Sequence, residues 1–277
     1  MSRTWFITGT SSGFGRQMTE KLLARGDRVA ATARSTDRLS DLKDRYGDLL
    51  WTAELDVTDT AAVREVIARA FHELGRIDVI VNNAGYGLFG AAEELSDEQI
   101  RDQIATNLVG PIQVTRAALA HLREQGGGRI IQLSTYGGQA ANPGASLYNA
   151  SKFGVEGFME SLALELAPFG IGVTIVEPGG AATGFRARGS RLAEPLSAYD
   201  DTPAAMVRGV RDYAHYVGDP AKVADAIIGS VDQQPAPRRL VLGSDAYTFV
   251  HDAVAARLRE IEAQESVAGA TDAVKAA

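Results

Sequence analysis

The chain has 277 residues, 45% of them hydrophobic, and a net charge of -7 that is spread along its length. Without clustered Lys and Arg it lacks the electrostatic footprint of a nucleic-acid-binding protein, and without cysteine it forms neither disulfides nor a thiolate nucleophile. No apolar run is long enough to span a bilayer, and residues 1–3 lead into a short apolar strand rather than a signal-peptide core. We expect a soluble, cytoplasmic globular protein that binds neither nucleic acid nor membranes.

Strand-like and helical patterns alternate along most of the chain. Short runs, most of them nearly continuous Val, Ile, Leu and Ala, predict strands at Thr4–Thr8, Arg28–Ala33, Leu50–Leu55, Ile77–Asn82, Arg129–Ser134, Gly172–Glu177 and Arg239–Leu242. Helical spacing predicts helices at Gly15–Ala24, Thr60–Leu74, Asp97–Leu122 and Ser151–Leu166. This alternation is typical of βαβ units, so we predict an α/β fold with a doubly wound parallel sheet of about seven strands.

Two segments depart from this alternation. Residues 184–218 separate the sixth predicted strand from the next helix by more than a connection needs, which predicts a lid or binding loop. Residues 245–277 follow the last strand, and we predict a helix over Asp245–Glu265 with a fraying tail over Ser266–Ala277.

A glycine-rich turn follows the first predicted strand and precedes the first predicted helix. Glycines there permit positive φ and a close approach of backbone N–H groups to a pyrophosphate, which the helix dipole also favours. The spacing is G-x-x-x-G-x-G rather than the G-x-G-x-x-G of many dehydrogenases. The alternative is an ordinary tight turn. The cofactor-binding candidates in this turn are Gly9, Ser11, Ser12, Gly13, Phe14 and Gly15.

The end of the second predicted strand bears on the choice of cofactor. NAD sites usually place Asp or Glu there to bind the ribose hydroxyls, whereas this chain has Thr32-Ala33-Arg34. A guanidinium suits the 2′-phosphate of NADP(H) through charge-assisted hydrogen bonds. We therefore predict NADP(H) rather than NAD(H), with Arg34 as a ligand. The alternative is that Arg34 only solvates the start of a helix.

Tyr148 and Lys152 form the candidate catalytic pair. They lie four residues apart on a predicted helix, so both side chains emerge on one face. A Lys ammonium near a phenol favours the phenolate and lowers a pKa that starts near ~10, so we expect Tyr148 to exchange a proton near neutral pH. Because such pairs are common on protein surfaces, the interpretation depends on the surrounding motifs.

Those motifs occur in a specific order. They are Thr8–Gly15, Asp56-Val57, Asn82–Gly85, Asn107, and Ser134 with Tyr148 and Lys152, after which Pro178-Gly179 and Thr183 complete a nicotinamide-side loop. On these residues the chain resembles the short-chain dehydrogenase/reductase family from about Thr4 to Leu242. The resemblance implies a single Rossmann-type catalytic domain over residues 1–277 and hydride transfer to or from a nicotinamide ring.

The resemblance also implies a role for each matched residue. Tyr148 would exchange the proton of the substrate oxygen as general acid or base, and Ser134 would hydrogen-bond the same oxygen. Lys152 would hold the nicotinamide ribose and lower the pKa of Tyr148, and Asn107 would position a proton-relaying water. The other cofactor-binding residues that it implies are Asp56, Val57, Asn83, Ala84, Gly85, Pro178, Gly179 and Thr183.

These roles have structural alternatives. Ser134 could simply end a strand, Asn107 could lie on a helix surface, and Asn82-Asn83 could be turn formers. The run Asp56-Val57-Thr58-Asp59 also fits a helix-capping turn, with Thr58 or Asp59 as the cap.

The helices that hold Asn107 and Tyr148 carry apolar residues on more than one face, among them Phe153, Phe158 and Met159. In the family these helices pair with a second subunit, so we expect a homodimer or homotetramer. We expect no metal, because the 4 histidines lack metal-ligand spacing.

Together these residues predict an NADP(H)-dependent oxidoreductase that interconverts a ketone or aldehyde and an alcohol. The substrate is expected to be a small, apolar carbonyl compound or alcohol. Two alternatives stay open: a protein that binds NADP(H) as a sensor or scaffold without turnover, and an epimerase or dehydratase of the related extended group. The candidates for the substrate pocket are Tyr136, Gln139, Asn142, Phe185, Tyr199, Tyr213 and Tyr216.

Overall fold

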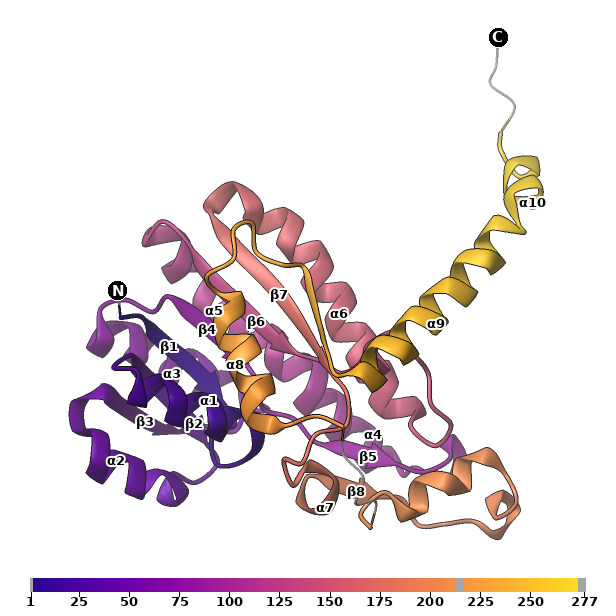
Figure 1. The fold of residues 1–277 in the computed structure, drawn as a ribbon, viewed down its shortest axis with the longest axis horizontal. Coiled ribbons are helices and arrows are strands. Elements are labelled where there is room, and N and C mark those ends of the chain that lie inside the picture. The colour runs from indigo at the N-terminus through magenta and orange to yellow at the C-terminus, as the bar shows by residue number, and fades with distance from the viewer. Residues whose placement is uncertain (1, 213–216, 274–277) are drawn as a thin grey trace.

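The computed structural model, which describes residues 2–212 and 217–273, is built on a parallel sheet of seven strands in the order β3-β2-β1-β4-β6-β7-β9 (Figure 1). The chain winds outward from β1 in one direction and then from β4 in the other, so the order reverses between these two neighbours. This confirms the predicted α/β fold, and the carboxyl ends of β1 and β4 mark the switch point at which such sheets bind ligands. The strands are β1 Thr4–Thr8, β2 Arg28–Ala33, β3 Leu50–Glu54, β4 Val79–Asn82, β6 Gly128–Leu133, β7 Ile171–Pro178 and β9 Arg239–Leu242.

Helices cover both faces of the sheet and bury two apolar cores. Met18 of α1 and Ile227 of α8 belong to one core, whereas Ile67 of α3, Val114 of α5 and Val155 of α6 belong to the other. Burying each such side chain contributes roughly 1.5–3 kcal/mol, and burial on both faces explains the continuous apolar runs of the strands. The helices are α1 Gly13–Ala24, α2 Ser40–Tyr46 and α8 Pro220–Ser230 on one face, and α3 Thr60–Leu74, α5 Gly110–Glu124 and α6 Ser146–Leu166 on the other.

The helix predicted over Asp97–Leu122 is interrupted in the structure. It comprises α4 (Asp97–Ile104), a π-helical turn over Ala105–Val109, and α5. Pro111 lies in the first turn of α5 and cannot donate a backbone hydrogen bond to the preceding turn, which favours a local change of helical pitch there. The sequence pattern alone did not reveal this turn, which holds Asn107.

The predicted lid, residues 184–218, has secondary structure of its own. It forms α7 (Phe185–Arg188) and β8 (Ser190–Leu192), and β8 pairs in parallel with β5 (Gly87–Phe89). Beyond β8 the buried Glu94 carboxylate accepts hydrogen bonds from the Leu196 N–H at 2.9 Å and from the Arg208 guanidinium at 3.0 Å. These contacts attach the segment to the body beside β5, and its mobility stays a prediction.

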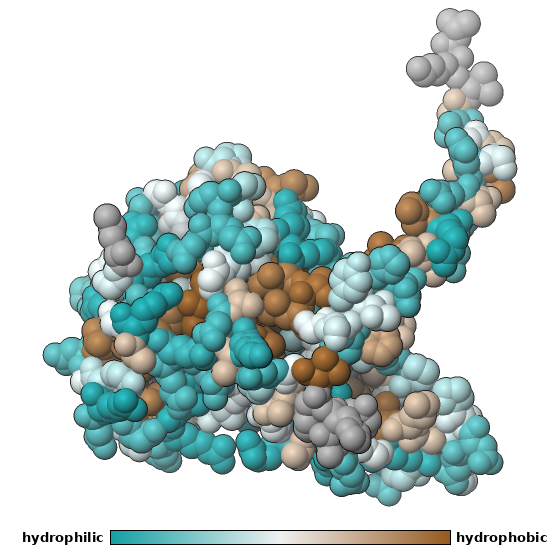
Figure 2. Space-filling view, viewed as in Figure 1, coloured by the Kyte–Doolittle hydropathy of each residue, from teal (hydrophilic) through white to brown (hydrophobic). Residues whose placement is uncertain are grey.

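The C-terminal segment forms an arm. Figure 1 shows α9 (Ser244–Glu262) leaving the body near α6 and leading into α10 (Glu265–Ala270), part of which we had predicted as a fraying tail. Apolar side chains are exposed along the arm, including Leu258, Ile261 and Val267 (Figure 2). Within residues 2–212 and 217–273, no helix has the length and apolar character to cross a membrane.

Candidate functional site

The glycine turn after β1 has the geometry of a phosphate cradle. Gly9 and Gly13 have φ values of 72° and 58°, which favour glycine. A Cβ atom at Gly15 would overlap the Gly9 carbonyl oxygen and lie 2.5 Å from the Asn83 side-chain nitrogen. The turn therefore needs glycine at all three positions, and it leads directly into the N-terminus of α1, where backbone N–H groups and the helix dipole favour an anion.

Hydrogen bonds join the loop after β4 to this glycine turn. Thr8 Oγ1 accepts hydrogen bonds of 3.0 Å from the backbone N–H groups of Asn83 and Ala84. In return, the Asn83 amide donates to the carbonyl oxygens of Thr8 and Gly9, both at 2.9 Å. Asn83 is thus more than a turn former, and Thr8, which sequence analysis treated only as part of the motif, holds the two loops together.

The loops after β2 and β3 carry the two groups predicted to bind the adenosine side of the cofactor. Arg34 is exposed directly after β2; its guanidinium forms no ion pair with residues 2–212 or 217–273, but its charge helps to lower the pKa of Asp56. Asp56 accepts from the Thr58 N–H at 2.9 Å and from the Thr58 hydroxyl at 2.7 Å. Asp59 caps α3 through the N–H groups of its first turn, which confirms the capping-turn alternative for this residue. Val57, which follows Asp56 in the sequence, is buried.

Tyr148 and Lys152 both lie on α6, which begins at Ser146, five residues before the predicted start. Lys152 Nζ lies 5.9 Å from the Tyr148 ring centroid and donates a 2.9 Å hydrogen bond to the Leu133 carbonyl oxygen. Burial lowers the pKa of Lys152 to about 8, and burial raises the pKa of the Tyr148 phenol. The expected lowering of the Tyr148 pKa is therefore wrong for this arrangement, because desolvation of the phenol, together with Tyr136, outweighs a hydrogen bond with Thr135, and the Lys152 ammonium is bonded to the Leu133 carbonyl oxygen.

Two phenylalanine rings enclose Tyr148. The Phe89 centroid lies 5.5 Å from the Tyr148 centroid, and that of Phe185 lies 6.1 Å away. Phe185 belongs to α7 of the predicted lid, whereas Phe89 ends β5 and was not a sequence-based candidate. The pairing of β5 with β8 brings both rings to Tyr148, and no local sequence signal reveals that pairing.

Asn107 is buried rather than on a helix surface. Its amide nitrogen donates to the Tyr86 carbonyl oxygen at 2.8 Å, and its amide oxygen accepts from the Tyr86 N–H at 3.1 Å. The same nitrogen lies 3.5 Å from the Ser151 hydroxyl, directly before Lys152. The π-helical turn thus directs Asn107 toward the loop after β4 and toward α6.

Ser134 follows β6 and is also buried. Its hydroxyl oxygen is hydrogen-bonded to Glu156 Oε1 at 2.5 Å. Glu156 belongs to a cluster in which the Arg239 guanidinium of β9 also contacts Glu177 of β7 and Glu160 of α6. Sequence analysis missed this cluster, although Glu156 follows Lys152 by four residues and so shares its helical face.

The loop after β7 closes over the glycine turn. Thr183 Cβ lies 3.6 Å from where a Cβ atom of Gly13 would be. The N–H of Gly180, next to Gly179 and Pro178, donates to the Asp245 carboxylate at 2.8 Å. Thr183 and Gly13, 170 residues apart in the sequence, are therefore brought together, as the predicted nicotinamide-side loop requires.

The residues predicted to line the substrate pocket lie in different surroundings. Tyr136 stacks on Phe249 with a centroid separation of 5.0 Å, and Gln139 donates to Glu177 at 2.5 Å. The Tyr199 hydroxyl donates to Glu93 at 3.0 Å. Asn142 is half-buried, with its carbonyl oxygen accepting from the Ala145 N–H. Tyr213 and Tyr216 lie outside the described residues.

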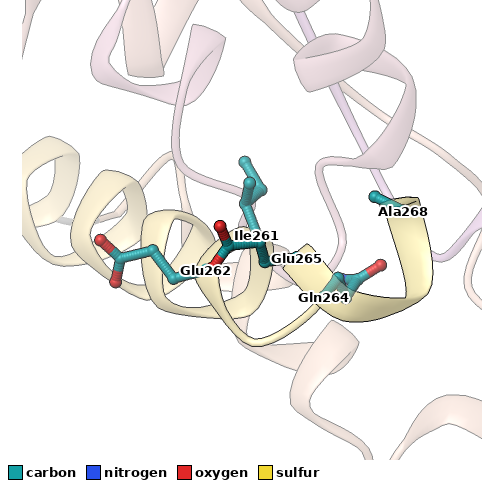
Figure 3. A pocket seen from close by; sticks show the side chains of 5 residues that line it. All are labelled: Ile261, Glu262, Gln264, Glu265 and Ala268. Carbon is teal, nitrogen blue, oxygen red and sulfur yellow. The ribbon is translucent and has the colours of Figure 1, made fainter. Parts of the chain in front are cut away.

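A surface hollow of about 480 Å³ lies elsewhere, where α9 meets α10 (Figure 3). It is lined by Ile261, Glu262, Gln264, Glu265 and Ala268. None of these is a predicted site residue, and the hollow is formed by the projecting arm. We therefore place the candidate site at Tyr148, where the chemically competent groups meet.

Comparison with known proteins agrees with this geometry. The chain matches the family described as short chain dehydrogenase over residues 3–191. It belongs to the short-chain dehydrogenase/reductase family. A relative, oxidoreductase BOA17 of Botryotinia fuckeliana, is 36% identical over 251 residues, which cover 90% of this chain and 92% of that protein.

Two further proteins extend the comparison. The crystal structure of a short-chain dehydrogenase from Streptomyces avermitilis has a TM-score of 0.92 and 40% identity, with 98% of each chain covered. The NADP-dependent 3-hydroxy acid dehydrogenase YdfG of Escherichia coli is 37% identical over 174 residues, covering 62% of this chain and 70% of that protein. The match to the Streptomyces avermitilis structure covers the C-terminal arm almost completely, so the architecture is shared along nearly the whole chain.

Proposed function

We propose that this short-chain oxidoreductase is NADP(H)-dependent and interconverts a ketone or aldehyde and an alcohol, with Tyr148 as general acid or base. The observation that carries the proposal is a set of contacts around α6: Lys152 lies 5.9 Å from the Tyr148 ring and binds the carbonyl oxygen of Leu133, which precedes Ser134, while Asn107 contacts Ser151. These groups come from the π-helical turn over Ala105–Val109, from the residue after β6 and from α6, so separate elements must pack together to connect them. A crevice at the switch point of a doubly wound sheet is where such folds bind their ligands.

The residues present fit a dinucleotide. The turn has no room for a Cβ atom at Gly9 or Gly15, and Gly13 has a positive φ, so the backbone itself is exposed to a pyrophosphate at the N-terminus of α1. The guanidinium of Arg34 is exposed and forms no ion pair within the described residues, although its charge helps to lower the pKa of Asp56, so it is available for a 2′-phosphate. The NADP dependence of the Escherichia coli relative supports the same choice. When bound, the nicotinamide supplies or accepts a hydride.

The side chains around Tyr148 provide the proton chemistry. Because burial raises its pKa, the phenol keeps its proton at neutral pH and can donate it to a substrate oxygen during reduction. Ser134 provides a second hydrogen bond to that oxygen and stabilises its developing negative charge. Lys152, with a pKa of about 8, is a cation near neutral pH beside both groups, and Asn107 fixes the Tyr86 loop next to it.

The two aromatic rings next to Tyr148 support an apolar substrate. Phe89 and Phe185 would contact the groups that flank the carbonyl carbon, and they exclude water from the hydroxyl of Tyr148. Because Phe185 lies on α7, the lid segment would take part in substrate selection. The expected homo-oligomer and the cytoplasmic location stay predictions from the sequence.

A panel of ketones and aldehydes, assayed with NADPH by loss of nicotinamide absorbance, tests the proposal. Turnover of at least one carbonyl compound is expected, and Tyr148→Phe should lower it by at least ~10²-fold while NADPH affinity stays within a few-fold. NADPH binding without turnover of any compound would favour the sensor or scaffold alternative. Turnover close to wild type in Tyr148→Phe would remove this phenol from the mechanism.

A further inference from the structure

Behind Ser134 lies a cluster of charged side chains that the proposed reaction does not use. Arg239 contacts two glutamates whose side chains are almost fully buried, Glu156 with 3% exposed and Glu177 with none. A third, Glu160, is bound at 2.6 Å and is 49% exposed. A Cβ atom at Gly138 would overlap Glu156 Oε1 and lie 2.7 Å from Ser134 Oγ, so the backbone packs directly against the Ser134–Glu156 contact.

The donors and acceptors of this cluster can be assigned individually. Glu177 accepts from the Gln139 amide and from the Arg239 guanidinium. Glu156 Oε2 accepts from Arg239 at 2.5 Å. Each of these contacts has an N–H donor, so each oxygen involved is an acceptor. The Glu156 Oε1–Ser134 Oγ contact alone joins two oxygens, and its proton can belong to either residue.

The charge balance favours a proton at that contact. Nη1 of Arg239 contacts both Glu156 and Glu177, so one guanidinium faces two buried carboxylates, and burying a second uncompensated negative charge is costly. Glu160 on the same helix adds negative charge at the surface, whereas Lys152 one turn away adds positive charge. Burial raises the pKa of Glu156, although its hydrogen bonds with Arg239 and Ser134 oppose this.

A serine hydroxyl has a single proton. If Ser134 donates it to an ionised Glu156, the hydroxyl has no proton left for a substrate oxygen. If Glu156 is a neutral acid, it donates to Ser134 Oγ, and the hydroxyl proton of Ser134 is free to point into the site. The protonation of Glu156 therefore decides whether Ser134 is a donor or only an acceptor toward substrate.

We propose that Glu156 is a positioning residue that works as a neutral acid, donating a hydrogen bond to Ser134 so that Ser134 can donate to the substrate oxygen. No covalent bond forms or breaks in this arrangement, and Glu156 keeps its proton throughout turnover. Arg239 and Glu177 hold the carboxyl group in place from behind. This inference rests on the proposed function only in assigning the substrate oxygen as the partner of Ser134.

The test compares Glu156→Gln with Glu156→Leu across a pH series of kcat/KM for carbonyl reduction. Glutamine imitates the neutral acid, since its amide nitrogen can donate to Ser134 and its oxygen can accept from Arg239. Glu156→Gln should stay within about threefold of wild type at low pH and lose the alkaline inflection that ionisation of Glu156 causes in the wild type. Glu156→Leu should fall by as much as about 10²-fold, the full contribution of one donor to the developing oxyanion, because Ser134 is no longer held toward the substrate oxygen. Glu160→Gln, which alters the same cluster without touching Ser134, should follow the wild-type profile.

Coupling through Ser134 gives the deciding comparison. In a Ser134→Ala background, Glu156→Gln should no longer change the pH profile, because the hydroxyl that transmits the effect is gone. An unchanged profile in the single variant, or an equal change in the Ser134→Ala background, would overturn the proposal. Either result would assign Glu156 to the stability of the fold.

Infrared spectroscopy of the protein without substrate provides a readout that needs no turnover. A protonated-carboxyl band is expected at neutral pH, absent in Glu156→Gln, present in Glu160→Gln and shifted in Ser134→Ala. If Glu156→Gln does not fold, the Ser134→Ala shift carries the test alone. Absence of any band that responds to these changes would overturn the proposal. Failure of the carbonyl panel would refute the proposed function and leave this spectroscopic result standing.

Discussion

The low pKa of Lys152 predicts a specific dependence of stability on pH. A pKa that falls from 10.5 to about 8 on folding corresponds to about 3 kcal/mol, at ~1.4 kcal/mol for each pH unit. Between these pH values the unfolded chain binds more protons at this site than the folded protein does, so the free energy of unfolding rises with pH. Below the folded pKa both states hold the proton, and the buried ammonium destabilises the fold by a constant amount.

Replacing Lys152 with methionine removes this titration. We expect the free energy of unfolding of the wild type, relative to Lys152→Met, to rise by about 2 kcal/mol between pH 7 and pH 10. The Leu133 carbonyl loses its donor in the variant at both pH values, so this loss cancels in the comparison. Lys222→Met, which changes an exposed lysine on α8, serves as the matched control.

Urea unfolding followed by circular dichroism at the two pH values gives the required free energies. The wild type and Lys152→Met share every other titratable group. The difference between their free energies of unfolding therefore reports the titration of Lys152. A difference that is the same at pH 7 and pH 10, or a comparable change in Lys222→Met, would refute the reasoning. The ammonium would then be solvated or paired in the folded protein, contrary to its burial.

Three further predictions concern the cofactor, the substrate and assembly. Arg34→Ala should weaken NADPH binding by about 1.5–3 kcal/mol, the contribution of a hydrogen bond to a charged group, and leave NADH binding nearly unchanged; equal losses in titrations with both cofactors would contradict the assignment. Phe185→Ala should change the ranking of kcat/KM among substrates of different bulk more than Tyr199→Phe does, because only the Phe185 ring faces Tyr148. Light scattering at micromolar concentration should give a homodimer or larger; of the apolar residues named above, Phe153 is exposed for such a contact, whereas Met159 is fully buried.

Local patterns were sufficient for the scaffold of this protein. Apolar runs predicted β1, β2 and β9 with their observed bounds; β1 and β2 are apolar almost throughout because they are covered on both faces, whereas β9 is half-buried. The glycine turn was predictable for a similar reason, since Gly15 has no space for a Cβ atom and only one residue type fits. Four residues make about one turn of a helix, so the spacing of Tyr148 and Lys152 was enough to predict that their side chains lie close together.

The tertiary structure decided the surroundings of these groups. The order of the strands places Arg239 of β9 beside Glu177 of β7 and across from Glu156, and pairing between β5 and β8 brings Phe89 and Phe185 to Tyr148. The direction of the Tyr148 pKa also depends on burial, which no spacing predicts. The sequence by itself determined which chemical groups this protein has and which of them lie one turn apart on a helix. Their desolvation, partners and protonation depend on contacts between residues far apart in the chain, and only the packed fold determines those.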